Sequence, residues 1–346
     1  MIDFVNKNLQ AEKYLKLTRP KYLYPVIFLS LTMLWTVTIH PVFASDTEGR
    51  KTSVQPWTAA LQTKYFFKSH TSYEFGNPFP PNQAPLSRLE FPLNSWWAGA
   101  SLRREFSRFS VGAEVLRNLS GEAKDDMTDS DWDDDAQPDT LTIYSESSCR
   151  IEPSYIVHVD ADLKISDWMG LPKWVDLRPA AGVTWQRFSL VTHDGVQSYP
   201  APGDTRPPES LPGDGIRFEQ TYWQFWTGLK AAFDLGKPFH LSGLKLQTQV
   251  DWAYVDAANE DYHMLSIGKR ITNEKTAGNA WHALVNLKIG LTQNLNANIG
   301  AEYLRIVTTG SHRLVHETFG IDFTFENGVK VWSRQISATM GLEYSF

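Results

Sequence analysis

The last stretch of the chain, Ile336 to Phe346, reads I-S-A-T-M-G-L-E-Y-S-F, and its residues alternate strictly in polarity. In a β-strand, successive side chains point to opposite faces, so this segment predicts a strand with one apolar face and one polar face. The apolar face would carry Ile336, Ala338, Met340, Leu342, Tyr344 and Phe346.

The same two-residue period appears in the segments 157–165 and 281–289, whose polar faces carry charges such as Asp160, Asp162 and Lys288. A soluble sandwich of two sheets can also alternate, but its buried face rarely needs such long uniform strands. Charges on one face and apolar residues on the other are typical of a membrane barrel with a polar lumen and a lipid-facing exterior.

Ten candidate strands follow one another along the chain. An even number suits a closed single-chain bacterial barrel, and short connections such as Ser107-Arg108 alternate with long loops at the other end. Tryptophans near strand ends, among them Trp96, Trp97 and Trp252, suit the aromatic girdles of a membrane protein. The sequence predicts an all-β fold, a closed ten-stranded antiparallel transmembrane β-barrel with long extracellular loops. The strands are expected near 54–75, 87–106, 109–119, 154–167, 175–194, 216–236, 239–258, 279–292, 295–309 and 330–346.

The first 44 residues resemble an export signal. A basic segment precedes an uncharged apolar run from Tyr22 through Ile39, and Ala44 offers a small residue at the cleavage point. The run is also long enough for an uncleaved anchor, but Pro41 and the small residue after it favour cleavage. We expect a cleaved signal peptide, residues 1–44, followed by one outer-membrane barrel domain, residues 45–346.

Composition excludes some functions. The formal charge is −6, and removing the basic leader makes the chain more acidic, so nucleic acid is not an expected partner. A single cysteine, Cys149, cannot form an internal disulfide. These features suggest a bacterial envelope protein.

Two short motifs carry candidate chemistry. M-T-D-S-D-W, from Met127 to Trp132, places Asp129 and Asp131 in the second long loop, and D-Y-H places Asp261 and His263 in the fourth. Both loops would lie on the same rim of the barrel. Carboxylates held close together cannot both ionise freely and can share a proton while holding a water. An aspartate beside a histidine can fix its tautomer and make the ring a better base. Together the four residues describe a hydrolase that activates water directly.

Other interpretations of these motifs remain open. The acidic run from 125 to 135 could be a solvated loop, and its alternating aspartates could hold calcium, although Asp134 and Thr140 replace the glycine and glutamate of an EF-hand. We expect no metal at the site, because no H-x-x-x-H or cysteine partner lies near His263. A serine nucleophile such as Ser130 lacks the glycines of a nucleophile elbow.

The combination resembles the omptins, ten-stranded outer-membrane proteases of Gram-negative bacteria. The matching features are M-x-D-x-D-W, the D-x-H that is followed by G-K-R-I-T (Gly268 to Thr272), the spacing from Glu74 to Leu89-Glu90, and the aromatic C-terminal strand. The resemblance implies an endopeptidase of the outer membrane whose site faces the outside of the cell, acting on peptide or protein substrates. In that scheme His263 is the general base, Asp261 orients it, and the aspartate pair positions the water.

The resemblance further implies cleavage beside basic residues, through a glutamate on the first strand and an acid two residues before the D-x-H aspartate. Glu74 matches the first, but Asn259 occupies the second, and the side chain of Glu260 should point the other way in an extended segment. No cofactor is expected, although the family implies a bound lipopolysaccharide, required for activity, among outer-membrane lipids. The alternative function is a non-catalytic barrel, either a narrow pore or an adhesin, with acidic surface loops.

Overall fold

The computed structural model describes residues 57–76, 85–236 and 243–346. The predicted signal peptide, residues 1–44, lies outside them. The described residues form fourteen β-strands and one short 3-10 helix, η2 (Glu317–Phe319). Among these residues, no helix has the length and apolar character needed to cross a membrane. The strands are β1 (Trp57–Phe66), β2 (His70–Phe75), β3 (Ser87–Pro92), β4 (Trp96–Glu105), β5 (Phe109–Asn118), β6 (Met127–Asp131), β7 (Ile143–Ile151), β8 (Tyr155–Leu163), β9 (Val175–Ser198), β10 (Glu209–Asp234), β11 (Leu244–His263), β12 (Arg270–Gly290), β13 (Leu295–His316) and β14 (Ile321–Ser345).

The alternation predicted for the C-terminal strand is confirmed in β14. Met340, Leu342 and Tyr344 are 57%, 53% and 51% exposed on the outer face, whereas Ser337 on the opposite face is 1% exposed. The apolar residues therefore face outward and the polar residues face the lumen.

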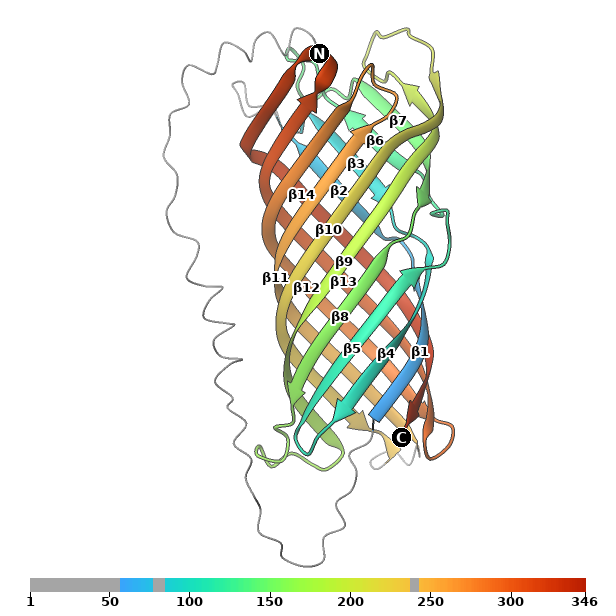
Figure 1. Cartoon of the computed structure of the whole chain (residues 1–346), viewed down its shortest axis with the longest axis vertical. Coiled ribbons are helices and arrows are strands. Elements are labelled where there is room, and N and C mark those ends of the chain that lie inside the picture. The colour runs from blue at the N-terminus through green and yellow to red at the C-terminus, as the bar shows by residue number, and fades with distance from the viewer. Residues whose placement is uncertain (1–56, 77–84, 237–242) are drawn as a thin grey trace, which may run out of the picture. The chain divides into compact units, whose positions relative to one another are not determined.

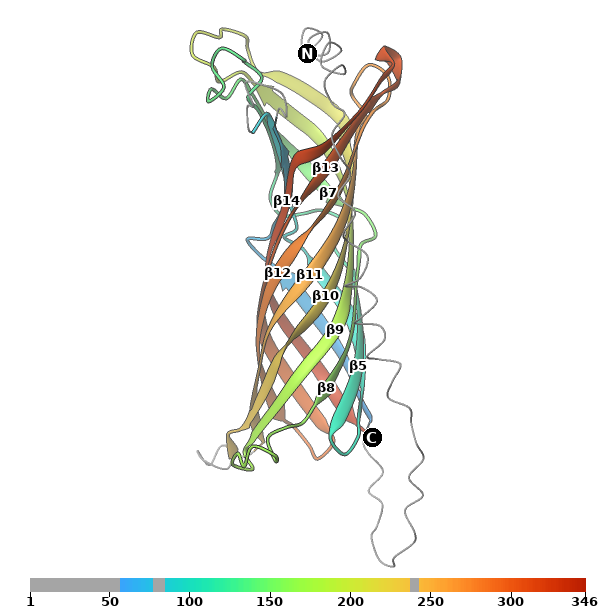
Figure 2. The same ribbon diagram turned by 90° about the vertical axis from the view of Figure 1, so that its left-hand side faces the viewer.

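Ten strands form a closed ring in the order β1-β4-β5-β8-β9-β10-β11-β12-β13-β14. The ring closes because β1 pairs with both β4 and β14, and the pairs are antiparallel. The tilted strands wrap around a common axis (Figures 1 and 2). The predicted all-β ten-stranded barrel is confirmed.

A second ring of strands continues the barrel beyond the first. It shares β9 to β14 and replaces β1, β4, β5 and β8 by the short strands β2, β3, β6 and β7, with β2 joining β14 and β7 joining β9. Two predicted strands, 54–75 and 87–106, are therefore each divided in two, and β6 and β7 form where a loop was expected. The second ring is built largely from sequence that had been assigned to loops.

The division between the rings has a local cause. Lys68, between β1 and β2, adopts a left-handed conformation with φ 49°, which a strand cannot accommodate. The neighbouring Ser69 amide donates a hydrogen bond of 2.8 Å to the side-chain oxygen of Asn94, between β3 and β4. Pro92 at the end of β3 has no amide hydrogen to continue a ladder. The breaks between β1 and β2 and between β3 and β4 therefore lie at the same height along the barrel.

The outer face changes character where the second ring begins. On β14, read from the C-terminus towards the second ring, the outward apolar residues stop at Ile336, and the next outward residue is Arg334. On β13, the outward residue after Tyr303 is Arg305. An apolar band edged by aromatic residues marks the membrane-spanning part of such a barrel. The second ring therefore stands beyond the bilayer.

The predicted aromatic girdle includes Trp96 but not its neighbour. Trp96 is 46% exposed, whereas Trp97 is 0% exposed and packs inside the barrel, with ring centroids 5.7 Å from Phe66 and 5.9 Å from Phe188. Because adjacent residues of a strand face opposite directions, only one of the two tryptophans can reach lipid. The expectation for Trp97 was wrong.

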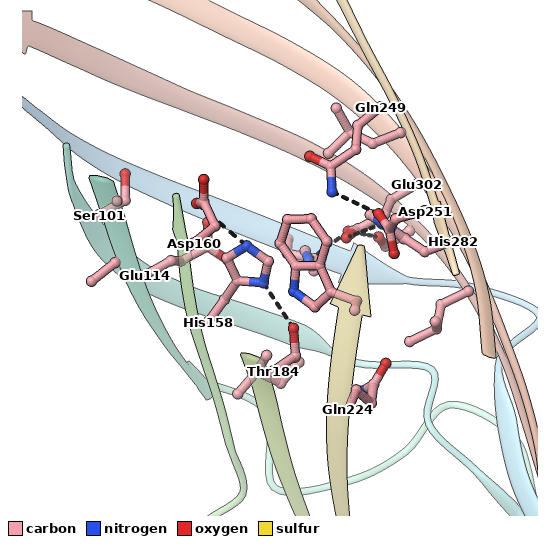
Figure 3. Close-up of a pocket in the computed structure, with 18 of the residues that line it drawn as sticks. Ser101, Glu114, His158, Asp160, Thr184, Gln224, Gln249, Asp251, His282 and Glu302 are labelled. Atoms are coloured by element: carbon pink, nitrogen blue, oxygen red, sulfur yellow. Dashed lines mark hydrogen bonds and ion pairs between the residues drawn. The ribbon is translucent and has the colours of Figure 1, made fainter. Parts of the chain in front are cut away.

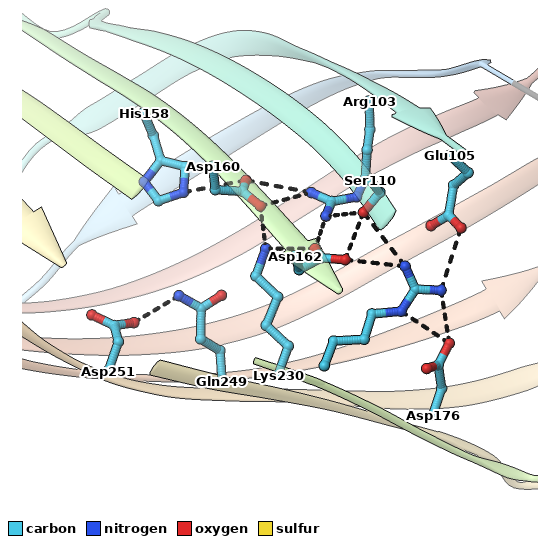
Figure 4. Close-up of polar contacts among 11 residues, drawn as sticks. Arg103, Glu105, Ser110, His158, Asp160, Asp162, Asp176, Lys230, Gln249 and Asp251 are labelled. Carbon is cyan, nitrogen blue, oxygen red and sulfur yellow. Dashed lines mark hydrogen bonds and ion pairs between the residues drawn. The ribbon is translucent and has the colours of Figure 1, made fainter. Parts of the chain in front are cut away.

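Ion pairs fill the lumen of the first ring. Asp160 and Asp162 on β8 both contact Arg103 from β4 and Lys230 from β10, and Arg178 from β9 lies 3.1 Å from Asp162 (Figure 4). Buried charges are tolerated only when paired, so this cluster explains why the inward face of so many strands can be charged.

A second cluster shares the same lumen. His282 contacts Asp251 at 2.7 Å and Glu302 at 2.9 Å, and Lys64 lies 2.6 Å from Glu302 (Figure 3). Both clusters line a cavity of about 260 Å³. Because these charges are already paired with one another, we assign this cavity a structural role.

Candidate active site

The aspartate pair lies on a short strand rather than in a loop. β6 pairs with β3 on one side and β7 on the other. Met127 is 1% exposed, and because side chains alternate, Asp129 and Asp131 share its inward face whereas Ser130 points outward. Asp133, beyond the strand, is exposed. Strand formation therefore separates two aspartates from the rest of the acidic run.

The Asp261-His263 pair lies at the C-terminal end of β11. His263 Nε2 lies 3.1 Å from Asp261 Oδ2, and Asp261 is 0% exposed. A carboxylate only accepts hydrogen bonds, so Nε2 carries the ring proton and Nδ1 presents its lone pair. The expected fourth loop is only the turn between β11 and β12, so both residues are held by strand pairing.

Burial and mutual charge push the carboxyl pKa values apart. Burial raises the pKa of Asp129 well above its usual range, and the charges of Asp131 and Asp261 add to the effect. Burial also raises the pKa of Asp131. Asp261 is 0% exposed, yet the charge and hydrogen bond of His263 hold its pKa below the usual value. These influences link β6 electrostatically to β11, and because the two shifts have opposite signs, Asp129 holds a proton more strongly than Asp261 does.

Sequence reasoning missed three charged residues on the next two strands. Arg270 on β12 pairs in register with His263, and its positive charge lowers the pKa values of Asp129 and Asp261. Glu274, also on β12, is 1% exposed and contacts His312 of β13 at 2.8 Å. Arg270 lies in the G-K-R-I-T stretch. That stretch served as a family signature, but no role was assigned to the arginine. Glu274 and His312 meet because β12 pairs with β13. No local sequence pattern near either residue predicts this contact.

A family model confirms the resemblance to the omptins. The model of the Omptin family matches residues 27–346. The chain belongs to the omptin family. As a member of that family it is an outer-membrane protease of a Gram-negative bacterium.

One solved structure shares the fold at a high structural similarity, and a second matches with a low one. The crystal structure of the outer membrane protease OmpT from Escherichia coli matches with a TM-score of 0.74 and 16% identity, covering 88% of this chain and 100% of that one. The outer membrane protein OprG from Pseudomonas aeruginosa matches with a TM-score of 0.36 and 8% identity, covering 84% and 96% of the two chains. No curated protein sequence matches this one.

In this omptin, the three residues predicted to bind substrate do not converge. Glu74 on β2 is paired with Arg88 at 2.8 Å and with Lys330 at 3.7 Å. It lies on the face opposite to the inward-pointing Tyr73, so the structure does not bring it to the aspartates. Asn259 does face inward, and it accepts a hydrogen bond of 3.1 Å from Gln220.

Glu260 follows the expected alternation. It is exposed on the outer face, whereas its neighbours Asn259 and Asp261 are buried. Glu260 therefore does not replace the acid that is absent at 259. The omptin thus holds its proposed catalytic residues on one interior surface, and of the three proposed specificity residues only Asn259 shares it.

Proposed function

We propose that the protein is an endopeptidase in which a water is activated between Asp129 with Asp131 and the pair Asp261 with His263. The observation that carries this proposal is the contact of 3.1 Å between His263 and a fully buried Asp261, within electrostatic reach of the desolvated carboxyl group of Asp129 on another strand. Buried carboxyl groups with opposed pKa shifts suit acid-base catalysis.

The proposed reaction needs no cofactor. Nδ1 of His263 takes one proton from the water as its oxygen forms a bond to the peptide carbonyl carbon. The resulting imidazolium is stabilised by Asp261 and then gives the proton to the peptide nitrogen as the carbon–nitrogen bond breaks. The products are a carboxylic acid and an amine, so the atoms of water are all accounted for.

The aspartate pair has two tasks in this scheme. Asp131, with a hydrogen bond from Ser87, orients the water, and Asp129 keeps its proton because of its raised pKa. A protonated carboxyl group can donate a hydrogen bond to the negative oxygen that develops on the substrate carbonyl. This is a role that an ionised Asp129 could not perform.

We place the preference for basic residues in the summed acidity of the cleft rather than in Glu74. Asp131, Asp261 and Glu274 face the interior beside the protonated Asp129, and the guanidinium of Arg270 offsets only part of their charge. A concave site lined by one sign of charge attracts the opposite sign. A lysine or arginine side chain beside the cleaved bond is therefore favoured over a neutral one.

We further propose that the active site faces the outside of the cell and that lipopolysaccharide supports activity. The paired ends Trp57 and Phe346 lie at the opposite end of the barrel from the second ring. The proposal about the lipid rests on membership of the omptin family. At the seam between the rings, a hollow of about 310 Å³ holds Lys68 and Arg334, whose cations can contact a phosphate group, but its carboxyl groups Glu90, Asp125 and Asp126 outnumber them.

The alternative is a non-catalytic barrel, as a pore or an adhesin. The lumen of the first ring is crossed by ion pairs, which disfavours a conducting pore, whereas an adhesin gives no reason to bury Asp261 fully beside His263. The observation that favours an enzyme is therefore this burial.

Assay of the refolded protein against a library of fluorogenic peptides tests the proposal, with and without lipopolysaccharide. Cleavage that depends on His263 and is enhanced by the lipid is the expected result. Failure to cut any peptide in the presence of lipid would contradict the proposed function.

A further inference from the structure

Three aromatic rings stack across the interior of the second ring. Phe91 of β3 and Phe218 of β10 lie 4.2 Å apart between centroids with planes 6° from parallel, and Tyr73 of β2 lies 5.7 Å from Phe218 at 9°. All three side chains are 0% exposed. The strands β3 and β10 are not neighbours, because β6, β7 and β9 lie between them. The stack therefore joins two separate parts of the wall.

The stack lies beside both halves of the active site. Phe218 is the register partner of Asp261. On the other wall, Phe91 shares the inward face of β3 with Leu89, which is the register partner of Asp129. Well-packed aromatic side chains have few alternative rotamers, so this contact fixes the separation between the two catalytic strands.

Tyr73 adds a polar contact to this stack. Its hydroxyl donates a hydrogen bond to Asp261 Oδ2, the same oxygen that His263 Nε2 approaches at 3.1 Å. The phenol is thus the second of two groups that hold one carboxylate oxygen. None of the catalytic roles proposed above uses it.

We propose that Tyr73 is a positioning residue for the proteolytic reaction, and that its hydroxyl, held by the ring stack, fixes the Asp261 carboxylate in the orientation that aims His263 at the aspartate pair. This inference rests on the proposed catalytic role of Asp261 and His263. The substrate does not contact Tyr73 in this scheme.

The electrostatics of the site agree with a permanent donor at this position. Burial, followed by the charge of Asp261, raises the pKa of Tyr73 well above its usual value, so the phenol keeps its proton throughout the working range. His263 on the same strand, Tyr73, and Arg270 on β12 favour the ionised form of Asp261 against the effect of burial. The acidic groups Asp129 on β6 and Glu274 on β12 also interact with its charge and oppose ionisation.

The Tyr73→Phe variant removes the hydroxyl and keeps the stacked ring. Loss of a hydrogen bond to a charged group is expected to lower kcat about ten- to a hundredfold with little change in KM. Without this donor Asp261 accepts a proton more readily, so the acid limb of the kcat/KM profile should move to higher pH. A purely structural role would not move that limb.

Tyr222→Phe is the matched control. Tyr222 is also 0% exposed inside the second ring, and its hydroxyl lies 3.1 Å from Thr71 rather than at Asp261. The control should keep the wild-type kcat and pH profile, and both variants should unfold as cooperatively as the wild type, at a midpoint within a few degrees of it.

The outcomes separate this inference from the proposed function. If the wild type cleaves and His263→Ala does not, a Tyr73→Phe variant with wild-type kcat and acid limb overturns the inference alone. Equal losses in Tyr73→Phe and Tyr222→Phe without a shift of the limb also overturn it. An inactive wild type, or an active His263→Ala variant, overturns the proposed function and the positioning role with it.

Discussion

Asn259 on β11 and Glu274 on β12 lie directly opposite each other, and both side chains are buried inside the second ring. The position at which the family implied an acid is thus neutral, but a carboxylate stands beside it on the next strand. We predict that Glu274→Gln lowers the preference for basic substrates about tenfold, since a charge-assisted hydrogen bond contributes roughly 1.5 to 3 kcal/mol. Asn259→Asp should raise the preference. The measurement is the ratio of kcat/KM for matched peptides with arginine and glutamine at the cleaved position.

Glu74→Gln provides the control for this assignment. Its carboxylate is already neutralised by Arg88 and Lys330 on the outer wall, so the ratio should stay at the wild-type value. If the ratio falls in Glu74→Gln but not in Glu274→Gln, Glu74 determines the selectivity, as the sequence indicated.

The catalytic assignment predicts loss of activity without loss of fold. His263→Ala and Asp129→Ala should each lower kcat at least a hundredfold, the usual contribution of a positioned acid or base or of an oxyanion donor. Both residues lie beyond the membrane-spanning part, so the heat-modifiable band on gels and the β-sheet circular dichroism should be unchanged. Wild-type turnover in either variant would remove that residue from the mechanism.

The fold was predictable because its signal is repeated in nearly every strand. The alternation at Ile336 to Phe346 identifies the outward face, and the outward exposure of Met340 and Leu342 follows from it. The division of the first two predicted strands was not predictable. It depends on the left-handed Lys68 and on the contact of Ser69 with Asn94, which exist only once distant segments meet.

The same division limits what the sequence could say about the site. Asp129, Asp131, Asp261 and His263 were recognisable from two compact motifs, and the structure holds them on interior faces of paired strands. Glu74 follows the break at Lys68. The alternation of side chains along β1 therefore does not predict whether Glu74 points into or out of the barrel. Tyr73 and Glu274 reach Asp261 through tertiary packing, for which no local pattern exists.

The raised pKa of Asp129 predicts a pH-dependent cost in stability. A carboxyl group whose pKa is raised by folding binds more protons in the folded state, so it lowers stability progressively as pH rises above its unfolded value of 3.8. The neutral amide introduced by Asp129→Asn carries no such cost. The free energy of unfolding of this variant, minus that of the wild type, should therefore grow from pH 4 towards neutrality. Urea titrations at a series of pH values measure this difference, and a difference that shrinks with rising pH would contradict the burial of an uncompensated carboxyl group.

The ion pairs of the lumen should matter for stability and not for catalysis. Arg103 contacts Asp160 and Asp162, and the side chain of Asp162 is 1% exposed. Removing the sole partner of a buried charge costs about 3 to 5 kcal/mol, but Lys230 and Arg178 still contact these aspartates. We therefore predict a smaller destabilisation of about 1.5 to 3 kcal/mol for Arg103→Ala, the usual value of a hydrogen bond to a charged group, measured by urea unfolding in lipid vesicles, with unchanged kcat in the protein that remains folded.

Arg187→Ala is the matched control for this last prediction. Arg187 pairs with Glu219 at 2.8 Å, but the two side chains are 43% and 41% exposed, so water and salt screen the interaction. An exposed pair of this kind contributes about 0.2 to 1 kcal/mol. The two variants remove the same side chain, so the difference expected between them reflects the burial of the Arg103 contacts and their larger number. Equal destabilisation would show that the lumen pairs are solvated, and a fall in kcat for folded Arg103→Ala would show that the first ring takes part in the chemistry of the second.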